Sequence, residues 1–165
     1  MNGRRSIARD GITAGIIGAT AVAVWFLIVD TIAGHPLHTP RILGTALFSV
    51  LGPLGNEGSA VHILAYTVFH YVAFIVVGII AAAIIHWADR EPTVLAGLLI
   101  LFVAFEVGFY GLTALLAEYL PLGDLAWYQV AVGNLIAAVL MGTYLWRTNP
   151  ALGRHFVEAL DGREV

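Results

Sequence analysis

Four long apolar segments limit what this chain can fold into more than any other feature of its sequence. They cover about residues 11–32, 60–87, 93–117 and 125–146. A helix needs about 20 mostly apolar residues to cross about 30 Å of hydrocarbon, and each segment is long enough. The apolar residues occupy all sides of each segment rather than one stripe, as expected when lipid surrounds the helices. We therefore expect an all-α integral membrane protein with four transmembrane helices, folded as one membrane domain over residues 1–165.

The composition supports this class and excludes several others. Hydrophobic residues make up 59% of the chain and charged residues 12%, against about 25% charged residues in soluble domains. A soluble protein with four such helices buried would have almost no polar surface. The absence of cysteine excludes disulfides, thiolate metal sites and thiol redox chemistry. The net charge of -3, without a concentrated basic face, predicts no nucleic-acid partner.

The distribution of arginine predicts the orientation of the chain. All basic side chains are arginines, and cytoplasmic flanks carry the excess of positive charge in membrane proteins. An amino terminus on the inside places all of them except Arg41 in cytoplasmic segments. Both termini are then cytoplasmic. This composition and topology are similar to those of many small bacterial proteins of the inner (plasma) membrane, which is the location we expect.

Two shorter segments outside the spans also have helical patterns. Thr39 resembles an N-cap followed by Pro40 at the first helical position, and a wide apolar stripe continues to residue 51. We expect a short interfacial helix over about residues 40–51 on the outer face. Asn149 and Pro150 repeat the signature, which predicts a short amphipathic cytoplasmic helix over about residues 150–160.

Small residues recur four apart in the predicted spans and indicate close helix packing. Examples are Gly11 with Gly15, Gly78 with Ala82, and a later pair at 133 and 137. Lipid removes the usual hydrophobic drive between helices, so small residues that let backbones approach favour association. They serve either packing within one chain or interfaces in a homo-oligomer or with other membrane subunits.

Glu106 is the clearest candidate for a functional side chain. It lies near the centre of the third span, where an ionisable group costs several kcal/mol unless it is paired or hydrated. Depth estimates from a rise of about 1.5 Å per residue place His70 and Asn134 within about 5 Å of the same level. The resulting polar stripe, with Asp30 at its outer mouth, contains His62, Tyr66, His70, Glu106, Tyr110 and Asn134.

Three roles are open for this stripe. In the first, Glu106 is protonated, or it is hydrogen-bonded to His70 and Asn134 as a structural link between helices. In the second, the stripe is a proton or cation path or a small-molecule pocket. The third role is a contact with a partner subunit.

Histidines also suggest a metal site and a haem or pigment site. His35, His38 and His62 meet Asp30 and Glu57 on the outer side in this topology, and such ligands suit zinc or copper. The alternative is that these histidines are only interfacial. Spans one, three and four contain no histidine, which excludes a bis-histidine haem between two helices of one chain. Haem or a chlorin pigment would then use His70 as a single axial ligand, or His70 paired with its copy across a homodimer.

No catalytic motif is recognisable in the sequence, and no cofactor is required by it. There is no glycine-rich phosphate loop, no His-Glu-x-x-His and no Glu-x-x-His pair. We therefore expect a non-enzymatic inner-membrane protein that acts as a subunit or small-molecule-binding module of a membrane assembly. The alternatives are a small oligomeric transporter or channel coupled to protons or cations through Glu106 and His70, and a haem or pigment protein that uses His70.

Overall fold

The computed structural model describes residues 7–52, 58–88, 96–116 and 127–149, and every regular element in these ranges is an α-helix. The helices are α1 (Ile7–Ile32), α2 (His38–Leu51), α3 (Ser59–Ala88), α4 (Ala96–Leu116) and α5 (Trp127–Thr148). Three of them, α1, α3 and the Tyr128–Thr148 stretch of α5, are long and apolar enough to cross a membrane. In α4 the corresponding apolar stretch, Gly97–Gly111, is shorter.

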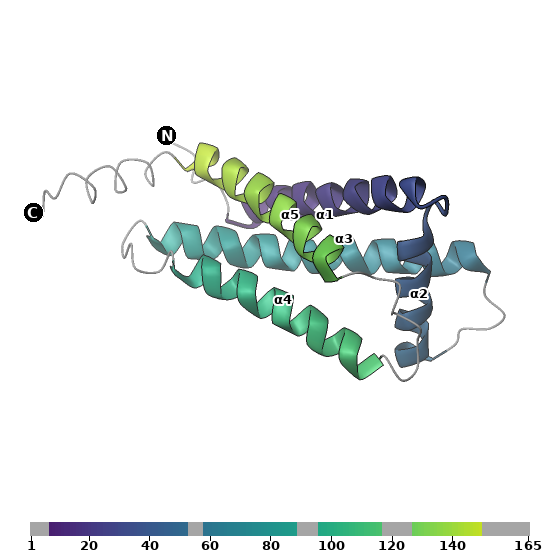
Figure 1. Ribbon diagram of the computed structural model, residues 1–165. Coiled ribbons are helices and arrows are strands. Elements are labelled where there is room, and N and C mark those ends of the chain that lie inside the picture. The colour runs from purple at the N-terminus through teal and green to yellow at the C-terminus, as the bar shows by residue number, and fades with distance from the viewer. Residues whose placement is uncertain (1–6, 53–57, 89–95, 117–126, 150–165) are drawn as a thin grey trace, which may run out of the picture.

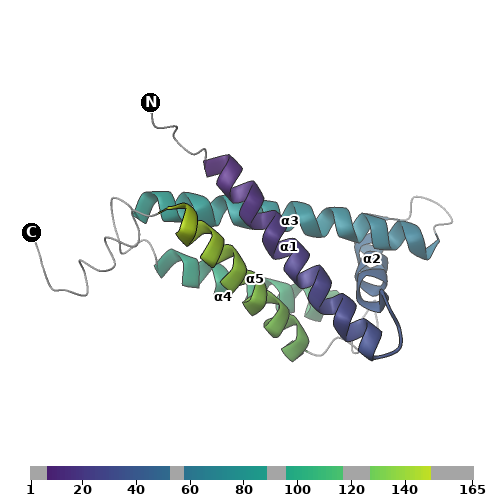
Figure 2. The ribbon, with the colours of Figure 1, turned by 90° about the horizontal axis from the view of Figure 1, so that it is seen from above.

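The long helices run in alternating directions and pack around α1 and α3. Helix α1 lies along α3 and α5, whereas α2 crosses one end of the bundle and packs mainly on α3 (Figures 1 and 2). Helix α4 starts beside α3 and diverges from it (Figure 1), so it touches α3 and α5 over only a few residues. The start of α1 and the end of α5 lie at the same end of the bundle, opposite α2.

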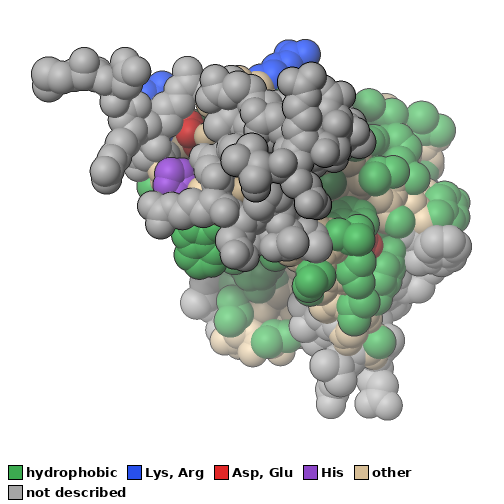
Figure 3. Space-filling model, turned by 90° about the vertical axis from the view of Figure 1, so that its left-hand side faces the viewer, with side chains coloured by type: hydrophobic (Ala, Val, Ile, Leu, Met, Phe, Trp, Pro, Cys, Tyr) green, Lys and Arg blue, Asp and Glu red, His purple; other side chains and the backbone are tan. Residues whose placement is uncertain are grey.

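Large apolar side chains cover much of the outside. Leu64, Leu99 and Val107 each expose about two thirds of their surface, at 65%, 67% and 64%. The end view shows hydrophobic side chains on the flank of the bundle (Figure 3). Exposing such a surface to water is unfavourable, whereas exposing it to hydrocarbon is not. The exposed apolar side chains are therefore consistent with helices that lie in a membrane.

The observed helix bounds follow the predicted ones closely, with two differences at helix starts. Helix α1 begins at Ile7 rather than near residue 11, and its first turn includes Asp10, a favourable charge at a helix N-terminus. The prediction that Thr39 caps the short outer helix is wrong: α2 begins at His38, and Leu37 occupies the cap position with a left-handed φ of 65°. Pro40 is still tolerated, because the first turn has no need of its missing N–H. The predicted tail helix at 150–160 lies outside the described residues.

Helices α1 and α3 approach closely at the glycines that the spacing pattern singled out. A Cβ added at Gly15 would lie 2.5 Å from the Ile75 Cα and from the Phe74 carbonyl oxygen. One added at Gly78 would collide with the backbone of Gly11 and Gly15. The prediction of close packing through small residues is therefore confirmed for α1 and α3, within one chain.

We expect Gly15→Ala to destabilise the protein by about 2 kcal/mol, because its methyl group meets backbone atoms that cannot move aside. Thermal unfolding in mild detergent measures the effect. Gly111→Ala is the matched control, since a Cβ at Gly111 meets nothing within 4 Å and alanine is the better helix former. Equal melting temperatures for Gly15→Ala and Gly111→Ala would contradict the close contact of α1 with α3.

Candidate functional site

His70 is the most enclosed of the predicted site residues on α3, and it is bonded to the neighbouring helix. Its side chain is buried, and its Nε2 lies 3.1 Å from the Ala19 carbonyl oxygen of α1. A carbonyl oxygen only accepts hydrogen bonds, so Nε2 carries the proton and donates it. In the neutral imidazole, Nδ1 is then left as a hydrogen-bond acceptor.

Aromatic rings surround this imidazole on its own helix. The ring centroids of Phe74 and Tyr66 lie 4.8 Å and 5.6 Å from that of His70, and the Tyr71 ring is edge-on at 6.0 Å. The Tyr71 hydroxyl is 3.0 Å from the Thr20 hydroxyl. Since Thr20 donates its own proton to the Ile16 carbonyl, Tyr71 is the donor of this second bond between α3 and α1.

His70 and Tyr66 line two cavities. The larger one, which we call the lateral cavity, has a volume of about 560 Å³ between α2, α3 and α4, where α4 diverges from α3. Its described lining is Leu43, Ala46, Leu47, Val50, Leu51, Tyr66, Phe69, His70, Ala73, Phe74, Ala104, Phe105, Gly108 and Phe109. The second, which we call the α1 cavity, has about 260 Å³ between α1, α2 and α3 and is also lined by Tyr66 and His70.

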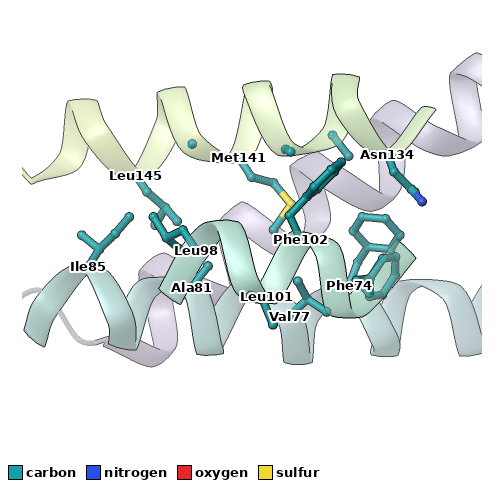
Figure 4. Close-up of a pocket in the computed structure, with 14 residues that line it drawn as sticks. Phe74, Val77, Ala81, Ile85, Leu98, Leu101, Phe102, Asn134, Met141 and Leu145 are labelled. Atoms are coloured by element: carbon teal, nitrogen blue, oxygen red, sulfur yellow. The ribbon is translucent and has the colours of Figure 1, made fainter. Parts of the chain in front are cut away.

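Asn134 belongs to a third, smaller cavity of about 140 Å³ between α3, α4 and α5. It lies at one end of this cavity, and the other labelled side chains are apolar (Figure 4). Phe102 and Met141 point toward one another in its middle part (Figure 4). Asn134 is buried at 8% exposure, but it does not join the imidazole of His70 in either cavity that His70 lines.

Glu106 is half-buried on α4, and its carboxylate is the unusual polar group of the fold. Among the described residues, its Oε1 is the only fully enclosed side-chain oxygen or nitrogen without a hydrogen bond. No hydrogen bond or ion pair joins it to His70 or Asn134 in the described part of the chain. Its charge acts on Tyr110, one turn farther along α4. The predicted link between helices through Glu106 is thus not present in these ranges.

Asp30 binds the first turn of α2, and it also lines the α1 cavity together with Tyr66 and His70. It is buried at 4% exposure, and its two carboxylate oxygens accept hydrogen bonds from the Thr39 backbone N–H and hydroxyl, each at 2.8 Å. Thr39 lies in the first turn of α2, where free N–H groups and the helix dipole favour a negative charge. The sequence predicted that Thr39 caps this helix, but the capping acceptor is the carboxylate of Asp30 on α1.

The predicted outer histidines are distributed over two places. His35 and His38 lie near each other, with ring centroids 6.0 Å apart, and His38 Nδ1 is 3.2 Å from Arg41 Nη2. His62 lies on α3, where its Nδ1 is 3.2 Å from the Thr45 hydroxyl and its ring is 5.1 Å from that of Phe48. Within residues 7–52, 58–88, 96–116 and 127–149, no three His, Cys, Asp or Glu side chains form a metal-binding group. Glu57 lies outside these ranges.

The structure therefore brings Asp30, Tyr66 and His70 together at the α1 cavity. Asn134 lines a different cavity, and Glu106 and Tyr110 line none of the three. Two contacts that hold the site were missed from the sequence: the Ala19 carbonyl below His70, and the bond of 2.8 Å from Trp25 Nε1 to the Gln129 carbonyl, which ties α1 to α5. Both use backbone oxygens, for which no residue type gives a signal.

The fold and these contacts define the chain as an all-helical protein with three helices able to span a membrane. No family model, curated protein or solved structure matches it. The functional argument therefore depends on the cavities and on the polar groups that line them.

We expect Asp30→Ala to weaken the attachment of α2, because it leaves two donors of Thr39 unpaired at a buried helix end. The cost is about 1–3 kcal/mol. In this variant the amide hydrogens of α2 should exchange faster than in the wild type, while those of α3 change less. Thr39→Ser keeps both donors and serves as the control. Unchanged exchange in Asp30→Ala would show that α2 does not depend on this carboxylate.

Proposed function

We propose that the protein is a non-enzymatic, four-span membrane protein that binds a lipophilic small molecule in the lateral cavity. The observation that carries this proposal is the cavity itself, about 560 Å³ and lined almost wholly by apolar side chains. Ligand sites commonly measure about 300–1,000 Å³ and combine an apolar lining with a few polar groups. Tyr66 and His70 are polar groups of this kind.

The membrane topology belongs to the same proposal. Helix α4 is the fourth span, because it has 21 residues and runs antiparallel to α3. Arg9 belongs to the first turn of α1 and Arg147 to the last turn of α5, whereas Arg41 belongs to α2. The start of α1 and the end of α5 lie opposite α2 (Figure 1). The excess of positive charge favours the cytoplasm for the former end. Both termini are then cytoplasmic, α2 lies at the outer face, and the bacterial inner membrane is the proposed location.

The lateral position of the cavity favours a ligand that arrives from the bilayer. Its walls are α2, α3 and α4, and α4 has few contacts with the rest of the bundle. A molecule dissolved in the hydrocarbon reaches this space without crossing a polar surface. The protein then acts as a binding module, alone, as a homo-oligomer or as a subunit of a larger membrane assembly.

Haem or pigment ligation through His70 has less support. The Nε2 atom is engaged with the Ala19 carbonyl at 3.1 Å, which leaves Nδ1, next to the backbone, as the nitrogen for a metal. A metal bound at Nε2 would require this bond between α1 and α3 to break.

Filling the lateral cavity should abolish binding. Tetradecanol and tetradecane are suitable probes, and native mass spectrometry from mild detergent counts the adducts. We expect a saturable adduct of one molecule per chain in the wild type and at least a tenfold loss in Gly108→Leu. Gly108 lines the cavity and has free space at its Cβ, so leucine occupies ligand volume without a clash.

Gly111→Leu is the matched control for this experiment. Gly111 lies on the same helix with equally free space but does not line the cavity, so its adduct should equal that of the wild type. Non-saturable adducts, or equal adducts in all three proteins, would refute binding in the lateral cavity.

A proton- or cation-coupled transporter is the second candidate, and the enclosed, unpaired Oε1 of Glu106 is the observation that favours it. In a pure binding module this carboxylate only costs free energy. We therefore expect Glu106→Gln to stabilise the protein by about 1–3 kcal/mol in thermal unfolding and to leave the tetradecanol adduct unchanged. Glu106→Asp, which keeps the charge, is the control.

The transporter predicts a different result for the same variant. Proteoliposomes with an internal pH dye would then show flux under a proton or cation gradient that Glu106→Gln abolishes. Such flux would overturn the assignment as a binding module.

A further inference from the structure

Two polar side chains interrupt the lining of the lateral cavity, and they lie side by side. Tyr66 and His70 are one helical turn apart on α3, with ring centroids separated by 5.6 Å. Every other described residue of the lining is Gly, Ala, Val, Leu or Phe. The same two residues line the α1 cavity, so they border both cavities.

Both side chains have hydrogen-bonding capacity that the described part of the chain does not use. The bond of His70 Nε2 to the Ala19 carbonyl leaves Nδ1 as an acceptor without a partner in these ranges. The Tyr66 hydroxyl likewise has no hydrogen bond within them. Since Glu106 Oε1 is the only enclosed and unpaired atom there, the free atoms of Tyr66 and His70 have accessible surface. They are available to a ligand.

The arrangement fits one kind of polar group. A ligand hydroxyl complements both an acceptor at His70 Nδ1 and a hydroxyl at Tyr66, since it donates to the imidazole and accepts from the phenol. An alkane would leave both unsatisfied. A carboxylate would enter a space whose described lining has no Lys, Arg, Asp or Glu, which is unfavourable for a charge.

We propose that Tyr66 and His70 form a polar subsite that recognises the hydroxyl of an uncharged lipophilic alcohol or phenol, whose apolar part occupies the lateral cavity. This inference rests on the proposed function and specifies its ligand class. The hydroxyl lies beside the two side chains that border both cavities, and the bond to Ala19 holds the imidazole in the tautomer that accepts. Specificity then comes from α3, and the apolar volume from α2, α3 and α4.

Tyr71 provides a matched control on the same helix. Its hydroxyl is bonded to Thr20, and it lines the α1 cavity but not the lateral one. Tyr66→Phe and Tyr71→Phe therefore remove the same atom from neighbouring tyrosines, and only the first removes it from the proposed subsite. Both variants retain the aromatic ring and its packing.

The experiment compares tetradecanol, tetradecane and tetradecanoic acid on full-length protein by native mass spectrometry. We expect the wild type to bind the alcohol about tenfold more tightly than the alkane, and Tyr66→Phe to lose most of that difference. Tyr71→Phe should keep it. In protein with 15N-labelled histidine, the Nδ1 resonance of His70, assigned by its absence in His70→Gln, should move when the alcohol is added and stay when the alkane is added.

Each other outcome overturns a defined part of the proposal. Equal affinity for alcohol and alkane, both blocked by Gly108→Leu, would remove the subsite and leave the lateral cavity as a binding site. If tetradecanoic acid binds more tightly than tetradecanol, the proposal that the ligand is uncharged is wrong. Absence of saturable binding for all three probes would refute the proposed function together with the subsite.

Discussion

The close crossing of α1 and α3 is the contact on which the rest of the structure depends. In hydrocarbon there is little hydrophobic drive to hold helices together, so van der Waals contact and interhelical hydrogen bonds must do it. Gly15 and Gly78 let the two backbones meet, and Ala19 follows one turn after Gly15. This proximity allows the Ala19 carbonyl to accept the proton of His70 Nε2. A packing feature made of glycines thereby decides which nitrogen of a histidine is left for a ligand.

The helices were predictable from the sequence because length and apolar composition are local properties. The start of α2 was not. Thr39 has the side chain of an N-cap, and the sequence assigned it that role, but the carboxylate that accepts its N–H comes from Asp30 at the end of α1. The chain turns between the two helices at Gly34 and Leu37, both with positive φ. Only this turn brings Asp30 onto the helix end, and no local pattern shows it.

The candidate site was predictable where its residues share a helix and not where they lie on different ones. Tyr66 and His70 are four positions apart on α3, so helical periodicity places them on one face. Depth in the membrane puts Glu106 and Asn134 near the same level, but depth does not fix the direction in which a side chain points around its helix. Asn134 lines a separate cavity, and the enclosed Oε1 of Glu106 has no hydrogen bond in the described part of the chain. Rotation of each helix about its axis depends on packing, which the sequence leaves open.

A cavity within a bilayer faces a different problem of recognition from one in water. Transfer of an apolar molecule from lipid to an apolar pocket gains little from the hydrophobic effect, since lipid chains and apolar side chains are similar surroundings. Selectivity must then come from polar groups, whose hydrogen bonds hydrocarbon cannot replace. In this fold, α4 diverges from α3 and α2 lies crosswise, and the lateral cavity lies between these three helices. Helix α3 supplies the two hydrogen-bonding side chains of its lining, Tyr66 and His70. In the function that we propose, this volume accepts lipophilic molecules, and the pair on α3 distinguishes those that carry a hydroxyl.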